Sequence, residues 1–262
     1  MHFGMPTLIE QDNLEDTAIL CKNLGLQFIE LNMNFPYCQI ECLENIDYFL
    51  SIRKRYGLYV TIHLDENLNV CDFNQSVAKA YFETVRRVIT VAKHLHAPII
   101  NMHLHPGIYI TLPQEKVYLY EQYEDIYLKN MELFRKMCEE EIAKEDILIS
   151  VENTDGFLPF QRKAIEFLLE SKVFSLTLDI GHSYCANRVD ERIILERMDR
   201  LKHFHIHDAK ENKNHLTLGT GEINLSKWLT YAKENNCRCV LETKTIEALT
   251  RSVLWLKEHD KI

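Results

Sequence analysis

Residues 147–182 read ILISVENTDGFLPFQRKAIEFLLESKVFSLTLDIGH. The stretch opens with an apolar, β-branched run at 147–153, continues with helical spacing of apolar residues at 160–170 and closes with a second apolar run at 175–180. Strands that are buried on both faces read as nearly unbroken apolar runs, and a helix between two of them is typical of a β-α-β unit. The stretch therefore predicts an α/β fold with a parallel sheet.

The same alternation of short apolar runs and helical segments covers the rest of the chain. Strands are expected at residues 2–5, 28–33, 59–64, 99–105, 147–153, 175–180, 203–209 and 239–244. Helices are expected near residues 13–23, 41–56, 77–92, 121–142, 160–170, 190–200, 225–235 and 245–259. Because no linker-like break interrupts the 262 residues, the alternation predicts one domain, residues 1–262, folded as a closed (β/α)8 TIM barrel. A doubly wound open sheet is the alternative.

Composition excludes several classes of protein. With only 8 Gly and 6 Pro, the chain has little material for the many tight turns of an all-β sandwich. The net charge of -9 argues against a broad nucleic-acid-binding face, although a local basic groove is compatible with it. No apolar stretch reaches the roughly 18 residues of a membrane helix, and residues 1–5 show no leader pattern. We therefore expect a cytoplasmic protein whose 8 cysteines are reduced and not catalytic.

Polar residues recur at one parity near the carboxyl ends of the predicted strands. Alternate side chains of a strand point to opposite faces, so this set would face the barrel interior, and the apolar residues between them would face the helices. The carboxyl ends of barrel strands meet at one rim, where barrel enzymes place their active sites. The inward set is Glu30, Asn32, Thr61, His63, Asn101, His103, His105, Ser150, Glu152, Thr177, Asp179, His205, His207 and Glu242.

So many carboxylates and imidazoles at one rim would suffer repulsion and loss of hydration unless a cation compensated the charge. Each residue alone has an ordinary explanation, such as a satisfied core histidine or one half of a buried ion pair. Their joint placement predicts a metal site. Carboxylates with one imidazole suit Mn, Mg or Co, whereas further histidines favour Zn or Fe.

Other polar residues near this rim have weaker claims to a chemical role. His103 and His207 share the inward face and could orient ligands or contact substrate, whereas His203 lies deeper and is expected to be structural. Residues 218–221, LGTG, resemble a phosphate-binding loop only loosely and are interpreted as a tight turn. Lys210 could meet an anionic substrate, although an isolated basic residue on a loop is usually solvated.

Six groups of residues, in this order along the chain, resemble the xylose isomerase-like TIM barrels. That family includes sugar and sugar phosphate isomerases and epimerases, and also endonuclease IV, which acts on abasic DNA. The likeness extends from about residue 30 to residue 258, and it depends on the order of the motifs because each is weak alone. The motifs are HPG at 105–107, VENT at 151–154, LDIGH at 178–182, HIHDAK at 205–210, His215 followed by LGTG at 218–221, and LET at 241–243.

The resemblance implies a primary divalent metal held by Glu152, Asp179, His205 and Glu242. Extended to the larger metal cluster of endonuclease IV, it implies His63 and His105 for a second ion and His182 and His215 for a third, so one to three ions in all. Lys213 stands where relatives commonly carry a ligand Asp, and an ammonium group is a poor neighbour for a cation, which argues against the third ion. Glu66 stands where the repair enzyme has a DNA-contacting Tyr.

Two activities are compatible with this set. The first is a metal-dependent isomerase or epimerase of a sugar or sugar phosphate, in which the metal stabilises an enediolate while Glu152 and Glu242 remove and return the proton. Contacts to the substrate would then come from His103, His182, His207, Lys210 and His215. The alternative is a phosphodiesterase of the endonuclease IV type, acting on abasic DNA with Glu152 bridging two ions.

The loops at the predicted mouth favour the first activity. A DNA enzyme needs Lys, Arg and aromatic residues there to hold phosphates and an extruded nucleotide. Residues 6–13, 34–39 and 65–74 contain no Lys or Arg and carry acidic residues instead. A small carbohydrate is therefore the expected partner, with nucleic acid less favoured. The insertion at 108–116 is expected to be either a lid over the substrate or a contact surface in a homodimer.

Overall fold

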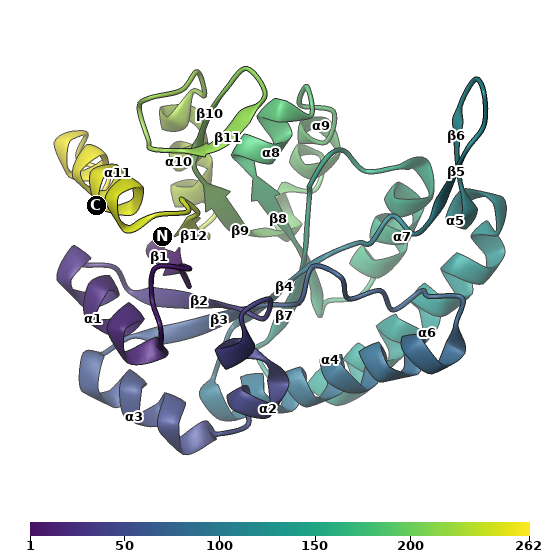
Figure 1. Cartoon of the computed structure of the whole chain (residues 1–262), viewed down its shortest axis with the longest axis horizontal. Coiled ribbons are helices and arrows are strands. Elements are labelled where there is room, and N and C mark those ends of the chain that lie inside the picture. The colour runs from purple at the N-terminus through teal and green to yellow at the C-terminus, as the bar shows by residue number, and fades with distance from the viewer.

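The computed structural model describes all residues, 1–262, and shows a closed barrel of parallel strands with helices around it (Figure 1). The ring closes where the first strand pairs with the last, and this confirms the (β/α)8 barrel expected from the sequence. In order around the ring, the strands are β1 His2–Pro6, β12 Arg238–Leu241, β9 Leu201–Ile206, β8 Phe174–Asp179, β7 Leu148–Glu152, β4 Ile99–His103, β3 Tyr59–His63 and β2 Phe28–Asn32.

Helices follow the barrel strands and cover their outer faces (Figure 1). They are α1 Leu14–Leu24, α2 Ile40–Leu43, α3 Ile46–Tyr56, α4 Gln75–Leu95, α5 Leu119–Gln122, α6 Glu124–Ile142, α7 Pro159–Leu169, α8 Ile180–Cys185, α9 Glu191–Leu195, α10 Leu225–Glu234 and α11 Ile246–Glu258. Two 3-10 turns, η1 Pro36–Cys38 and η2 Met198–Arg200, complete the helical elements. No helix combines the length and the apolar character that a membrane crossing requires.

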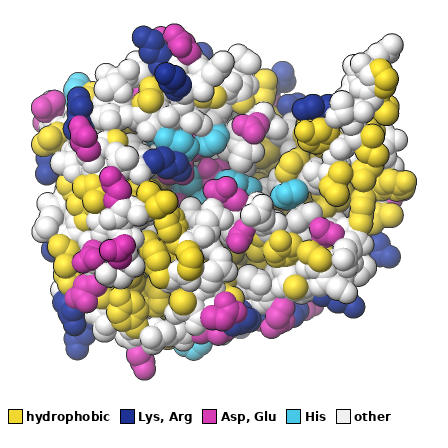
Figure 2. All heavy atoms as spheres, in the orientation of Figure 1, with side chains coloured by type: hydrophobic (Ala, Val, Ile, Leu, Met, Phe, Trp, Pro, Cys, Tyr) yellow, Lys and Arg dark blue, Asp and Glu magenta, His cyan; other side chains and the backbone are white.

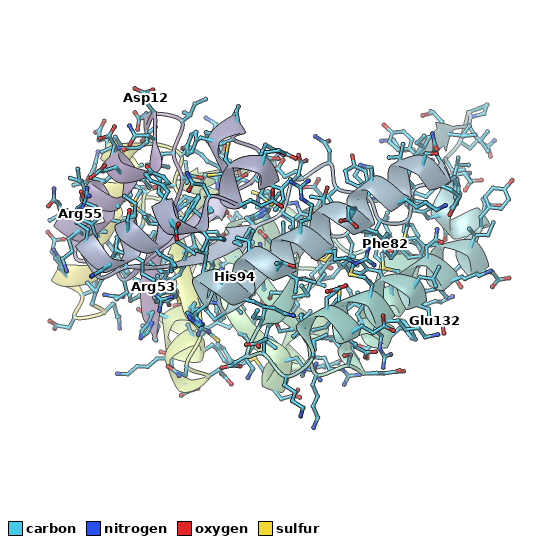
Figure 3. The ribbon with its side chains drawn as sticks, turned by 90° about the horizontal axis from the view of Figure 1, so that it is seen from below. Asp12, Arg53, Arg55, Phe82, His94 and Glu132 are labelled. Atoms are coloured by element: carbon cyan, nitrogen blue, oxygen red, sulfur yellow. The ribbon has the colours of Figure 1, made fainter.

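The helix α4 shows how the sequence directs this packing. Its start is capped by the Asn74 side chain, which accepts a hydrogen bond from the backbone of Ser76 at 3.1 Å. Its buried face packs towards the barrel, and α6 lies beside it on the outside of the molecule (Figure 3). Between the two helices, the rings of Phe82 and Phe134 meet edge to face with centroids 5.8 Å apart.

Element boundaries differ from the expectation mainly at the carboxyl ends of strands. The strands β4, β9 and β12 end at His103, Ile206 and Leu241, so that His105, His207 and Glu242 follow their strands instead of belonging to them. The alternation of polar and apolar residues continues past the last hydrogen bond between strands. It therefore indicates which side chains face the barrel interior, but not where each strand ends.

Two expected helices are interrupted. The segment 41–56 divides into α2 and α3 at Asn45, whose ψ of 64° is not helical. The segment 190–200 contains only the short α9 and the turn η2. Helical spacing of apolar residues therefore marked the right regions but did not show where each helix stops.

Two small hairpins lie outside the barrel. In one, β5 Tyr109–Thr111 pairs with β6 Lys116–Tyr118, and in the other β10 Asp208–Lys210 pairs with β11 Lys213–Leu216. The insertion at 108–116 therefore lies largely in the β5–β6 hairpin, which projects from the edge of the molecule (Figure 1). The LGTG stretch forms a turn around the buried Asp208, whose carboxylate accepts hydrogen bonds from Gly219 and Gly221 at 3.0 and 2.8 Å.

Candidate metal centre

Carboxylates and imidazoles gather in a hollow on one face of the barrel, where Figure 2 shows His side chains beside Asp or Glu. The four residues of the implied primary metal site come from strands that are neighbours around the ring. Glu152 and Asp179 are the last residues of β7 and β8, His205 lies near the end of β9, and Glu242 directly follows β12. The parallel barrel therefore carries four distant parts of the chain to one rim.

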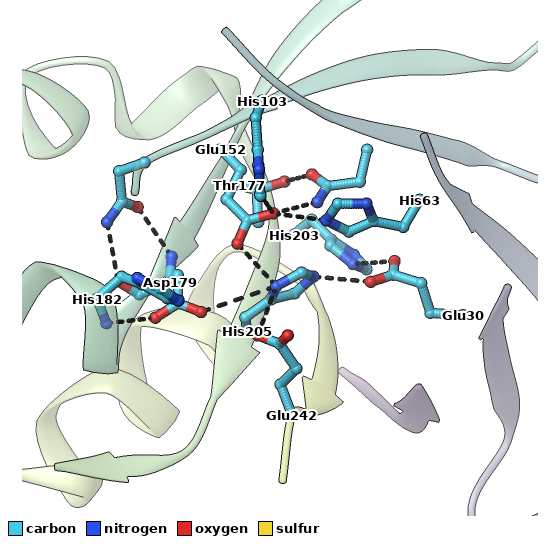
Figure 4. Close-up of polar contacts among 12 residues, drawn as sticks. Glu30, His63, His103, Glu152, Thr177, Asp179, His182, His203, His205 and Glu242 are labelled. Carbon is cyan, nitrogen blue, oxygen red and sulfur yellow. Dashed lines mark hydrogen bonds and ion pairs between the residues drawn. The ribbon is translucent and has the colours of Figure 1, made fainter. Parts of the chain in front are cut away.

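The ring nitrogen Nδ1 of His205 is the centre of this group (Figure 4). It lies 2.9 Å from Oε1 of Glu152, 3.1 Å from Oε2 of Glu242 and 3.8 Å from Oδ2 of Asp179. One potential ligand atom from each of the four residues lies within 4.8 Å of the others. Three of these side chains are almost fully buried, and Glu242, with 14% of its side chain exposed, borders the open side.

The chemistry of these donors fits a divalent metal ion. Both ring nitrogens of His205 and Oε2 of Glu242 are buried and form no well-directed hydrogen bond, although each has close neighbours. Three converging carboxylates with one imidazole are the oxygen-rich donor set that a divalent cation satisfies. Glu152, Asp179, His205 and Glu242 would together hold the ion.

Electrostatics supports the same assignment. Burial opposes ionisation of Glu152 and Glu242, but the neighbouring His205 holds the pKa of both carboxyl groups well below the usual range. The carboxylates in turn raise the pKa of His205 well above its ordinary value, against the effect of burial. A concentration of negative charge with a single imidazole at its centre is an environment that favours a cation.

Asp179 is held in place from three directions. Its backbone donates to Oδ1 of Asn153 at 2.9 Å, and Nδ2 of Asn153 donates to the Asp179 carbonyl at 3.0 Å. Nε2 of His207 lies 2.9 Å from both carboxylate oxygens. A Cβ atom at Gly181 would come within 2.0 Å of the His207 ring, so glycine is needed there for this approach. His207 is fully buried and orients Asp179 from behind, instead of facing a substrate.

Glu152 also contacts a second cluster. Nε2 of His63 and Nε2 of His103 lie 3.3 and 3.2 Å from Oε2 of Glu152. Nδ1 of His63 lies 2.7 Å from the carbonyl of Leu64, which can only accept, so Nδ1 carries the proton of a neutral His63. The Nε2 lone pair would then face a carboxylate. This contact is favourable only when His63 is protonated, as its pKa of about 9 beside Glu152 indicates, or when a cation lies between the groups.

The structure places His103, and not His105, beside His63 and Glu152. His105 belongs to none of the clusters that could hold a metal. It lies beyond the end of β4, half-buried, where its Nδ1 accepts a hydrogen bond from the backbone of Gly107 at 3.0 Å. Desolvation lowers the pKa of His105, so the residue is a neutral imidazole with its proton on Nε2.

A further cluster contains His182, His207 and His215. Nδ1 of His215 donates to the carbonyl of Glu242 at 2.9 Å, and this leaves Nε2 as a free acceptor. Burial lowers the pKa of His215 to about 4, so that the ring is neutral. His215 has a φ of 55°, a conformation that costs energy for a residue other than glycine and is enriched at functional sites. His182 and His215 thus lie together, as expected, and are the members of this cluster that are not fully buried.

The three lysines near this face have different positions. Lys210 is exposed at the rim, with Nζ 4.0 Å from Oε1 of Glu222, and Lys213 is exposed on β11. Neither contacts a member of the primary cluster. Lys244, to which the sequence pattern assigns no role, has Nζ 2.7 Å from Oε1 of Glu242. Although desolvation opposes it, this carboxylate raises the pKa of Lys244.

Three supporting residues had no assigned role from sequence alone. Asn153 stands in the VENT motif, and Asn101 and Glu30 belong to the inward set, so parity marked the latter two without indicating their function. The amide of Asn101 donates to Oε2 of Glu152 and in turn accepts from the Thr177 hydroxyl at 2.6 Å. The sequence showed the inward parity of Asn101 and Glu30, but it did not show which side chains of other strands they would meet.

Comparison with known proteins identifies the family. The sequence profile of the xylose isomerase-like TIM barrels matches residues 19–259, and the chain belongs to this family. A protein of Methanocaldococcus jannaschii, MJ1614, is 28% identical over 250 residues, which cover 90% of this chain and 93% of that protein.

Solved structures with the same fold include sugar epimerases. A D-tagatose 3-epimerase-like protein has a TM-score of 0.79 and 24% identity over 100% of this chain and 97% of its own. The 3-keto-D-glucoside 4-epimerase YcjR of E. coli has a TM-score of 0.77 and 14% identity over 98% of this chain and 99% of its own. The IOLI protein, whose structure contains a zinc atom, has a TM-score of 0.73 and 13% identity over 99% of this chain and 96% of its own. At these identities the likeness shows the fold.

Proposed function

We propose that this chain is a divalent-metal-dependent isomerase or epimerase of a sugar or sugar phosphate. The observation that carries the proposal is the convergence of Glu152, Asp179 and Glu242 on Nδ1 of His205 at the open rim of the barrel. Membership of the xylose isomerase-like family and the likeness to sugar epimerases support it. The zinc atom in the IOLI protein supports a metal at the site, where Mn, Zn, Mg or Co would suit the donors.

A divalent ion held by these four residues would polarise a carbonyl and the neighbouring hydroxyl of a sugar, and would so acidify the C–H bond of the carbon that carries this hydroxyl. The chain itself supplies the proton transfer. In ring order, β8 with Asp179 and β9 with His205 lie between β7, which carries Glu152, and β12, which Glu242 follows. The two carboxylates would therefore flank a bound substrate carbon, one removing a proton and the other returning it.

The substrate contacts follow from the hydrogen-bonding capacity of the rim. The free Nε2 of His215 accepts a hydrogen bond from a sugar hydroxyl, and the partly exposed His103 and His182 reach the same hollow. Lys210 is exposed near Glu222 and is placed to meet a phosphate only at the outer edge of the site. This arrangement suits a small polyhydroxy compound.

The test is metal-dependent exchange of solvent deuterium into a panel of ketoses and their phosphates, using protein loaded with Mn²⁺, Zn²⁺ or Co²⁺. We expect exchange with at least one substrate, and a loss of at least about 100-fold in both Glu152→Gln and Glu242→Gln, because each change removes a proton-transfer group and a metal ligand without changing volume. The matched control is Glu258→Gln on the exposed end of α11, which should retain wild-type exchange.

A parallel assay distinguishes the alternative activity. The same metal-loaded protein is incubated with duplex DNA that contains one abasic site. Nicking of this DNA without exchange in any sugar would overturn the proposal and favour a phosphodiesterase of the endonuclease IV type. Exchange without nicking supports the proposal.

A further inference from the structure

A buried carboxylate lies directly behind the proposed metal ligands. Glu30, on β2, has Oε1 2.8 Å from Nε2 of His205 and Oε2 2.9 Å from Nε2 of His203 (Figure 4). The hydroxyl of Thr61 donates to the same Oε2 at 2.9 Å. Glu30, Thr61 and the two histidines are at most 2% exposed, so this group is closed to substrate and solvent.

These contacts define which nitrogens carry protons. A buried carboxylate is stable only when donors surround it, and an ionised carboxylate can only accept hydrogen bonds. Nε2 of His203 therefore donates to Oε2 of Glu30, and Nε2 of His205, which lies 2.8 Å from Oε1 in a close but poorly directed contact, presents its N–H to the same carboxylate. When a metal ion takes the place of the proton on Nδ1, His205 keeps its single N–H on Nε2 and offers the lone pair of Nδ1 to the ion. That lone pair is on the side of Glu152, Glu242 and Asp179.

We propose that Glu30 is a positioning residue, which keeps the proton of His205 on Nε2 and thereby presents Nδ1 to the metal ion. This inference rests on the metal centre of the proposed function. A carboxylate that accepts the second N–H of a metal-bound histidine fixes the orientation of the ring and increases its basicity. Glu30 therefore acts on the metal ion through His205, from a position that no ligand can reach.

The two carboxylate oxygens of Glu30 have different partners. Thr61 and His203 satisfy one oxygen of Glu30, Oε2, and contact no metal ligand through it. The other oxygen, Oε1, is directed at His205 alone. A variant that removes only the Thr61 contact should therefore leave the metal ligand His205 unaffected. A variant that removes the charge of Glu30 should weaken the hold on His205.

The experiment measures metal binding, without any substrate. Wild type, Glu30→Gln and Thr61→Val are titrated with Co²⁺ in competition with a chelator, and the visible spectrum of bound Co²⁺ is recorded. We expect Glu30→Gln to weaken Co²⁺ binding about 10- to 100-fold and to alter the spectrum, because the amide no longer enforces one tautomer of His205. Thr61→Val, which keeps the carboxylate, should match the wild type in both.

The outcomes separate this inference from the proposed function. Tight binding of Co²⁺ by wild type with an unchanged affinity and spectrum in folded Glu30→Gln overturns the role of Glu30 and leaves the metal centre standing. Absence of Co²⁺ binding by wild type overturns the metal centre and, with it, this inference. If circular dichroism shows that Glu30→Gln does not fold, Glu30→Asp is used instead. This variant keeps the negative charge but moves it away from His205 by the length of one methylene group. Wild-type affinity in that variant also overturns the role.

Discussion

At the scale of single residues, the position of one ring nitrogen decides whether the rim can hold a metal. Asp179→Asn and His205→Ala each remove one donor from the group around Nδ1 of His205 while leaving the outer helices untouched. We therefore expect both variants to lose most bound metal when the purified protein is analysed by inductively coupled plasma mass spectrometry. Ser175→Ala, in the same strand as Asp179 but with a buried hydroxyl that has no partner, is the control and should retain the wild-type content. A stoichiometric metal content in Asp179→Asn or His205→Ala would contradict the ligand set.

The sequence predicted the members of the primary cluster better than their surroundings. Parity along a strand is a local property, so Glu152, Asp179 and His205 could be placed on the inward face from the alternation alone. The choice between His103 and His105 as the neighbour of His63 depended on where β4 ends, and both residues have the same parity. The role of Glu30 depended on contacts across the barrel, which no local pattern encodes.

At the scale of elements, the β5–β6 hairpin is the part of the chain whose use is least determined by the barrel. Its tip exposes Ile110 and Leu112, with 50% and 43% of their surfaces accessible. The backbone of Leu119 donates to the carbonyl of Ile108 at 2.9 Å, so the two ends of the hairpin already lie together. Residues 110–117 can therefore be removed while Tyr118, which packs on Phe160, is kept. If the hairpin is a lid over the substrate, which is one of its two expected uses, the deletion should raise KM and leave Co²⁺ affinity unchanged. Unchanged KM and kcat would exclude the lid, and a smaller mass in sedimentation would assign the hairpin to a subunit contact.

The loop before α9 provides a prediction on pH. The Asp190 carboxylate is fully buried, accepts from the backbone of Phe157 at 2.8 Å and has one oxygen without a partner. Burial raises its pKa above the ordinary 3.8, so the folded state favours the protonated acid. Its contribution to stability is therefore full below pH 3.8 and is lost as pH rises through the higher folded pKa.

Asp190→Asn removes this ionisation. Relative to wild type, the variant should gain stability between pH 3.5 and pH 7, by about 1.4 kcal/mol for each unit by which the pKa is raised. Urea unfolding at both pH values, with a chelator present, measures the difference. A gap in unfolding free energy between variant and wild type that does not change with pH would show that Asp190 is not the titrating group.

The boundaries of elements were the least predictable part of the fold. Apolar periodicity located the barrel strands because each must be buried on both faces, whatever its exact length. It could not show that β9 begins at Leu201 or that α2 and α3 separate at Asn45, because those limits depend on ladder pairing and backbone angles. Periodicity also could not show that β10 pairs with β11, or that the backbone of Gly219 donates to the carboxylate of Asp208. These contacts join residues that are apart in the sequence.

At the scale of the whole molecule, the four proposed ligands link β7, β8, β9 and β12, which is half of the barrel ring. An ion that binds only the folded state stabilises it by RT ln(1 + [L]/Kd), or about 2.7 kcal/mol at a free metal concentration of 100 Kd. For a chain of this size, that corresponds to a rise in Tm of roughly 5–10 °C, measured by calorimetry with Zn²⁺ or Mn²⁺ against a chelator. Glu242→Gln should lose most of this rise, because the remaining donors no longer complete the site. An equal rise in both proteins would mean that the added metal binds elsewhere on the chain, since a centre that has lost one of its four ligands binds the ion more weakly and stabilises the barrel less.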